Sequence, residues 1–166
     1  MDNFTKRDEK IFADLKACLK DSGLPIKEEH QNGTFMVIET EFDYATYPIK
    51  IIILLDSDHD TVIVNISYGV VPSNKIETLY DLINRINMTL CTSHFAVHPD
   101  TGQLALLSGM YFTEDMINKQ EFQIILKQLL SDSYNFAPLI GKQIESDEKP
   151  AEMFRKFLEK NKDRIV

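Results

Sequence analysis

Three segments of the chain carry apolar side chains on both faces of an extended strand, which limits the possible folds more than any other feature. In Tyr47–Leu55, every second residue from Tyr47 is apolar, and Ile52 and Leu54 lie on the other face. The second-face apolar residues of Thr61–Tyr68 and Gln103–Phe112 are Ile63, Ala105, Leu107 and Tyr111. An antiparallel sheet with helices on one side normally has a polar second face. These strands therefore predict a sheet that needs cover on both faces.

Helical periodicity on either side of these strands predicts the packing elements. Thr5–Ser22 has one apolar face at helical spacing, and Gly23 then suits a left-handed helix end, with Pro25 preventing continuation. A second helix is expected up to residue 87, with Asn74 and Glu77 at the spacing of a capping box. Both helices have the apolar stripe of core-facing elements.

The C-terminal third of the chain predicts two more helices. Thr113, followed by the acidic Glu114 and Asp115, suits a helix N-terminus. Ser131–Pro138 is expected to break or kink this third helix. Pro150 suits the first position of a final amphipathic helix.

The element order predicts an α+β fold of the form α-β-β-β-α-β-β-α with a C-terminal helix, built on a five-stranded, mainly antiparallel sheet. We expect one main domain over residues 1–144, followed over residues 145–166 by a charged linker and an amphipathic helix. The five predicted strands are 35–42, 47–55, 61–68, a short segment around 95–97, and 103–112.

Charge and cysteine content exclude several classes of partner. The 166 residues carry a formal net charge of −8, whereas duplex nucleic acid and anionic membranes reward basic proteins. Cys18 and Cys91 are too few and too far apart for a disulfide scaffold. Met1–Lys10 lacks the apolar core of a secretory signal, and no segment approaches the length of a membrane span. The sequence predicts a cytoplasmic protein that binds neither nucleic acid nor membrane.

Two segments offer metal-ligand residue types, and both are better explained without a metal. Asp56–Asp60 resembles the start of a calcium loop, but Thr61 replaces the required glycine and Ser67 the bidentate glutamate. On a strand, Cys91 points away from the face shared by His94 and His98. No phosphate-binding glycine loop or nucleophile elbow is present in the sequence. We therefore expect no catalytic residue, no metal and no cofactor.

A sheet that is apolar on both sides needs something to cover its second face. The candidates are a second copy of the chain, an extended peptide from a client, the C-terminal helix folding back, or a small apolar ligand. A sheet sandwiched between helices within one monomer is the simpler alternative. The residues expected to contact a partner or a second copy are Ile52, Leu54, Ile63, Leu107, Tyr111, Phe154, Phe157 and Leu158.

The stretch Leu82–Leu106 resembles a pattern shared by the YbjN family of bacterial sensory-transduction regulators and the type III secretion chaperones of the Tir-chaperone-like group. A helix end containing Asn84 and Asn87 leads into alternating Phe95-x-Val97, a turn, and a returning strand. The turn is Asp100-Thr101-Gly102. The resemblance covers about residues 5–140 and implies a small acidic homodimer whose apolar surfaces hold another protein.

The resemblance also implies structural roles for Asn84, Asn87, Asp100 and Gly102, with Asn87 capping or hydrogen-bonding the turn. The helical tail from Pro150 favours the YbjN family over the compact secretion chaperones. The leading hypothesis is a non-enzymatic, chaperone-like or regulatory protein-binding module that acts as a homodimer. A sensor of a small apolar ligand is the first alternative. An enzyme is the second, and it requires His94 or His98 to lie in a cleft near an acid or near Cys91.

Overall fold

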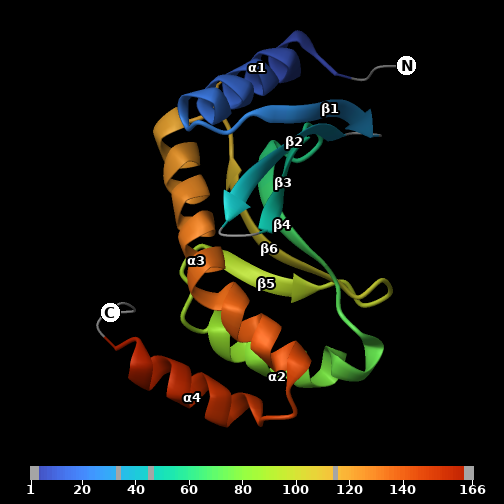
Figure 1. Ribbon diagram of the computed structural model, residues 1–166. Coiled ribbons are helices and arrows are strands. Elements are labelled where there is room, and N and C mark those ends of the chain that lie inside the picture. The colour runs from blue at the N-terminus through green and yellow to red at the C-terminus, as the bar shows by residue number, and fades with distance from the viewer. Residues whose placement is uncertain (1–3, 33–34, 45–46, 114–115, 163–166) are drawn as a thin grey trace.

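The computed structural model of the chain describes residues 4–32, 35–44, 47–113 and 116–162 and shows an α+β fold. Six strands form one antiparallel sheet in the order β1-β2-β3-β4-β6-β5, and the helices lie to one side of it (Figure 1). The elements are α1 (Lys6–Asp21), β1 (Ile26–Asn32), β2 (Phe35–Tyr44), β3 (Tyr47–Asp56), β4 (Thr61–Val70), the 3₁₀ turn η1 (Ser73–Lys75), α2 (Ile76–Asn87), β5 (Ser93–Val97), β6 (Gln103–Tyr111), α3 (Lys119–Glu145) and α4 (Pro150–Lys160).

The core lies between the helices and one face of the sheet, which we call the covered face. The central strands place alternate residues there, and each of these is at most 1% exposed: Ile51, Ile53, Leu55, Val62, Val64 and Ile66. Buried residues of α1, α2 and α3 belong to the same hydrophobic cluster. The predicted α+β class is thus confirmed, with all main helices on the same side of the sheet.

The sheet has six strands, so the expected number of five is wrong. The missed strand, β1, contains one apolar residue, Ile26, and no apolar alternation that would identify it. It forms because it pairs with the apolar strand β2, where Glu29 lies opposite Ile38. Lys16 of α1 also forms an ion pair of 2.9 Å with Glu29. Pairing with β2 thus outweighs the low strand propensity of the residues in β1, which lies at the edge of the sheet.

The third helix begins later than expected and is not broken. Asn118 caps α3 by accepting a hydrogen bond from the Glu121 backbone N–H at 3.1 Å, and Thr113 forms an isolated bridge with Met116 instead. Glu114 and Asp115, which suggested the earlier start, lie outside the described residues. Pro138 is exposed within a continuous helix that bends along its length (Figure 1). Despite its 27 residues, neither α3 nor another described helix has the apolar character of a membrane span.

The N-terminus of α1 agrees with the sequence prediction, whereas the N-terminus of α2 does not. Thr5 caps α1 and forms a capping box with Asp8. Before α2, the chain makes the 3₁₀ turn η1, and the helix start has no side-chain cap hydrogen bond. The expected capping box of Asn74 and Glu77 is therefore wrong, because Asn74 lies inside that turn.

The C-terminal helix α4 packs against α2 and α3 of its own chain, on the far side of these helices from the sheet (Figure 1). Met153 anchors α4 and is 1% exposed. The connecting segment is tied back to η1, because the Lys75 ammonium contacts the Ser146 carbonyl at 2.9 Å and the Asp147 carboxylate at 2.8 Å. The helix therefore extends the helical layer and covers no part of the second sheet face.

Candidate functional site

The sheet surface opposite the helices, which we call the open face, brings together the strand residues predicted to contact a partner. Leu54 and Ile63 lie directly opposite each other on β3 and β4. Ile52 and Leu107 flank Asn65, one on each neighbouring strand. All four predicted apolar residues are partly exposed. Strand alternation thus leaves an apolar patch at the centre of a surface that the described helices do not cover.

Tyr111 extends the patch at the end of β6, beside Thr61 of β4. Its side chain is 77% exposed, which makes it one of the most exposed large apolar residues described. The sequence interpretation did not include the partly exposed Phe35 of β2, or Val37, which pairs with Leu54 but is buried. The signal was present in the unbroken apolar run of residues 35–38. The patch therefore spans β2, β3, β4 and β6.

Asn65 places a polar group in the middle of this apolar surface. Its Oδ1 atom is buried and has no hydrogen-bond partner among the described residues. Its cross-strand neighbours Ile52 and Leu107 cannot supply a side-chain donor. A buried polar atom without a partner costs free energy, of the order of 1–3 kcal/mol. In the isolated chain, the centre of the open face therefore contains a polar atom that lowers stability.

The predicted α4 residues do not join the strand residues in one surface. Phe154 and Phe157 pack against the core from the helical layer, and Leu158 on the same helix is partly exposed. The rings of Phe157 and Phe136 of α3 pack with their centroids 5.3 Å apart. The eight predicted contact residues thus divide into an open-face group on the strands and a separate group on α4.

The helix-end asparagines and the following turn differ in what they contact. Asn87 joins α2 to β5, because its side-chain amide donates to the Phe95 carbonyl at 3.0 Å and accepts from the Phe95 N–H at 2.8 Å. Asn84 is exposed on the same helix. In the turn, the Asp100 N–H donates to the His98 Nδ1 atom at 3.3 Å. Gly102 has φ of +70°, a conformation that suits glycine.

A buried polar network joins α3 to the covered face without forming a catalytic arrangement. Ser93 donates to the Asp132 carboxylate at 2.6 Å, and Gln128 donates to its other oxygen at 2.9 Å. Tyr68 donates to the Ser133 hydroxyl at 2.7 Å, and burial raises the pKa of Tyr68 to about 12. These bonds satisfy structural groups within the core, and the described contacts place no histidine among them.

The metal and enzyme candidates from the sequence are engaged in local structure. The Asp56 carboxylate accepts from the Asp58 N–H at 3.1 Å and lies 2.8 Å from the His59 Nδ1 atom, which is ordinary turn chemistry. Cys91 lines a groove of about 190 Å³ beside Asp132, but no histidine lines it. Among the described residues, neither that loop nor the segment from Cys91 to His98 contains three metal-ligand groups within reach of one ion.

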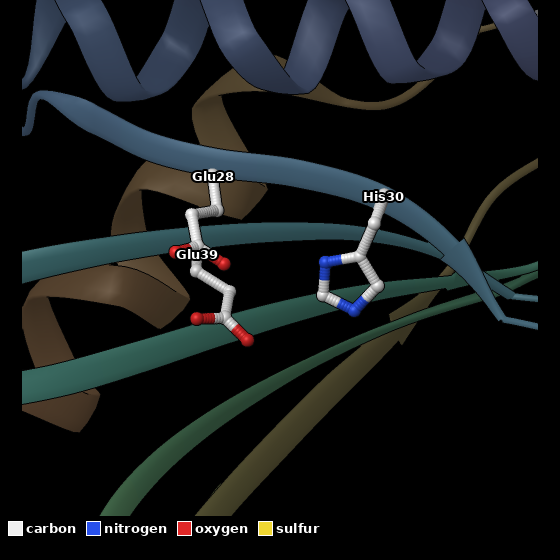
Figure 2. Close-up of side chains that lie close together, drawn as sticks. All are labelled: Glu28, His30 and Glu39. Carbon is white, nitrogen blue, oxygen red and sulfur yellow. The ribbon is translucent and has the colours of Figure 1, made fainter.

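One set of metal-ligand groups does converge in the described part of the chain, at the β1–β2 edge of the open face. The ligand atoms of Glu28, His30 and Glu39 all lie within 4.8 Å of one another (Figure 2). The sequence interpretation missed this group because Glu39 comes from the neighbouring strand. Only the β1–β2 register brings it beside Glu28.

A small apolar pocket lies between α3 and the covered face. Its volume is about 210 Å³, and its lining residues are Tyr68, Phe95, Leu104, Ala137, Ile140, Gly141 and Ile144. Sites for drug-sized ligands usually measure roughly 300–1,000 Å³. The pocket could hold a small apolar group, but it is small for a dedicated ligand site.

Comparison with known proteins places the chain in a recognised fold group. The family model of YbjN, described as "Putative bacterial sensory transduction regulator", matches residues 12–142. A chain of the ExsC–ExsE complex is similar in structure, with a TM-score of 0.53 and 15% sequence identity over 84% of this chain and 97% of that chain. YbjN from E. coli gives a TM-score of 0.48 and 16% identity over 73% and 84%. No curated protein sequence matches. The resemblance predicted from the sequence is confirmed by the family match and by the fold of the ExsC–ExsE chain.

Proposed function

We propose, because this chain belongs to the YbjN family, that it is a non-enzymatic protein-binding module, chaperone-like or regulatory, that acts as a cytoplasmic homodimer. The open face of the sheet is its binding surface. The observation that carries this proposal is the partly exposed patch formed by Ile52, Leu54, Ile63 and Leu107 on a sheet face without helices. Exposed apolar surface of this kind marks interaction sites.

The chemistry of the open face favours a polypeptide over other partners. Its apolar residues follow the two-residue period of the strands, so they suit an extended segment or another sheet. Asn65 lies among these apolar residues, and its Oδ1 atom has no hydrogen-bond partner among the described residues. The formal net charge of −8 favours a neutral or basic segment. A chain of the same fold occurs in the ExsC–ExsE complex, which agrees with a role in binding.

The decisive experiment places a charge in the patch and measures both mass and apolar surface. Ile63→Glu disturbs the open face, and Met88→Glu changes an apolar residue that is 89% exposed elsewhere, at the end of α2. Sedimentation at micromolar concentration gives the number of chains per particle. An apolar fluorescent dye reports accessible apolar surface.

We expect the wild type to contain two chains per particle and the Met88→Glu control to match it. If Ile63→Glu yields single chains, the open face joins the two copies. If Ile63→Glu remains dimeric but loses dye binding, the open face is exposed on the dimer and is available to another protein. Single chains of wild type that bind no dye would contradict the proposal.

The alternative function, a sensor of a small apolar ligand, depends on the 210 Å³ pocket beside Gly141. A Cβ atom added at Gly141 would have no atom within 4 Å, so Gly141→Leu should add apolar bulk to the pocket lining without a backbone clash. Small apolar compounds that raise the melting temperature of the wild type, but not of Gly141→Leu, would favour this alternative. Equal responses of the two proteins would dismiss it.

A further inference from the structure

The convergence of Glu28, His30 and Glu39 follows from strand geometry. Glu28 and His30 are two residues apart on β1, so both side chains point to the same face. Glu39 of β2 lies directly opposite Glu28, and His30 lies opposite the buried Val37. Figure 2 shows the carboxylates of Glu28 and Glu39 close together, with the His30 ring turned towards them. The three side chains therefore define one place at the edge of the open face.

Glu28 and Glu39 place two carboxylates opposite each other, and Lys50 neutralises that of Glu39 but not that of Glu28. Directly opposed like charges destabilise an antiparallel pair. Neither the Glu28 side chain nor the His30 side chain forms an ion pair or hydrogen bond with another described side chain. A cation between the carboxylates would turn this repulsion into attraction.

Glu39 is the least exposed of the three groups. The Lys50 ammonium on β3 lies 2.7 Å from its Oε2 atom, and the Glu39 side chain is only 18% exposed. This contact leaves the Oε1 atom available and holds the carboxylate in position, as outer contacts do for metal ligands. Glu28 and His30 are exposed and can move towards it. The ligand atoms now lie within 4.8 Å of one another. Because Glu28 and His30 can move towards the anchored Glu39, the ligand atoms can reach the separation of about 3.4 Å that surrounds a tetrahedral ion.

The donor set selects the class of ion. Calcium and magnesium take oxygen ligands, whereas an imidazole with carboxylates suits zinc and neighbouring divalent transition metals. Three protein ligands leave at least one coordination position for water or for an atom from another molecule. Because the site lies on the surface, the ion would be exchangeable.

We propose that Glu28, His30 and Glu39 bind one divalent transition-metal ion of the zinc class at the β1–β2 edge of the open face. The ion cross-links the edge strand β1 to β2 and relieves the repulsion between the two carboxylates. This proposal does not depend on what covers the open face, because all three ligands come from one chain. Its failure would leave the protein-binding proposal unchanged.

The test titrates Zn²⁺ into the full chain, free of any affinity tag, by calorimetry in a non-chelating buffer. The site variants are His30→Gln and Glu28→Gln, which change exposed side chains and should fold normally. The matched controls are His94→Gln, an exposed histidine on β5 at the opposite edge of the sheet, and Cys91→Ser, which removes the exposed thiol. Mg²⁺ and Ca²⁺ serve as comparison ions.

We expect one Zn²⁺ per chain, with affinity at least about tenfold weaker in both site variants and unchanged in both controls. Mg²⁺ and Ca²⁺ should not compete at equal concentration. Zn²⁺ should also raise the melting temperature of the wild type more than that of His30→Gln. Equal Zn²⁺ affinity in wild type and His30→Gln, loss of binding only in Cys91→Ser, or no saturable binding would each overturn the proposal.

Discussion

Ile53 and Ile52 are adjacent in β3 and chemically identical, yet they meet different surroundings. Ile53 points to the covered face and is fully buried beneath the helices, whereas Ile52 points to the open face and is partly exposed. The same contrast holds along β4, where Val62 and Val64 are buried and Ile63 is not. Apolar character on both faces therefore serves two purposes. The covered face stabilises the chain, and the open face is available for something outside it.

The largest expected difference comes from cutting back these two isoleucines. Ile53→Ala leaves a cavity in a close-packed core and should lower the free energy of unfolding by about 2–5 kcal/mol. Ile52→Ala removes atoms that already contact water and should cost about 1 kcal/mol or less. Urea unfolding of both variants measures the contrast. Equal losses would show that the open face is as well packed as the core.

A second expected effect comes from the buried hydroxyl of Tyr68 on the covered face. Its pKa is raised from 10.0 to about 12, chiefly because burial disfavours the phenolate. The unfolded chain therefore loses this proton at lower pH than the folded one, so folding stability is retained below pH 10 and falls as pH rises towards 12. The loss should approach about 2–3 kcal/mol.

Tyr68→Phe isolates this contribution. The variant keeps the ring that packs 6.0 Å from Phe95, and it loses the hydrogen bond to Ser133. It should be about 1 kcal/mol less stable than wild type at pH 8 and should lose less stability between pH 10 and 12. Urea midpoints across that range provide the measurement. Parallel pH curves for the two proteins would refute the assignment.

The contrast between the faces could be partly predicted from the sequence, because the two-residue period of a strand fixes which side chains share a face. Ile52, Leu54 and Ile63 were identified in this way. The pattern could not show which face the helices cover. That depends on how α2 and α3 pack, which is a tertiary property.

The elements that sequence reasoning missed share a dependence on neighbours distant in sequence. β1 has the composition of a charged loop and becomes a strand only because β2 offers it a partner. The cluster of Glu28, His30 and Glu39 requires that same register. The α3 start was misplaced because Thr113 and Asn118 are both good caps, and packing around the buried Ile117 and Phe122 decides between them.

Asn87 and Asn84, both on α2, provide a comparison with a smaller expected difference in stability. Asn87, between α2 and β5, exchanges two hydrogen bonds with the Phe95 backbone. Asn87→Ala leaves that N–H and C=O without their partner and should lower the free energy of unfolding by about 2 kcal/mol. Asn84→Ala on the exposed side of the same helix is the control and should lie within about 0.5 kcal/mol of wild type. If thermal unfolding shows that the two alanine variants are equally stable, the hydrogen bonds between Asn87 and Phe95 do not stabilise the fold.

The smallest change in stability is expected at Asn65, the polar residue in the middle of the open face. Its Oδ1 atom has no partner within the described chain, so Asn65→Val removes an unsatisfied group and places a good strand former among apolar neighbours. The isolated chain should be unchanged or more stable by up to about 1 kcal/mol. If a second copy or a client donates a hydrogen bond to Asn65, the same substitution should weaken that association while the fold is preserved. Unfolding and sedimentation of this single variant therefore test whether the open face is built for the chain itself or for a partner. A clear loss of stability in the isolated chain would show that Asn65 serves the monomer.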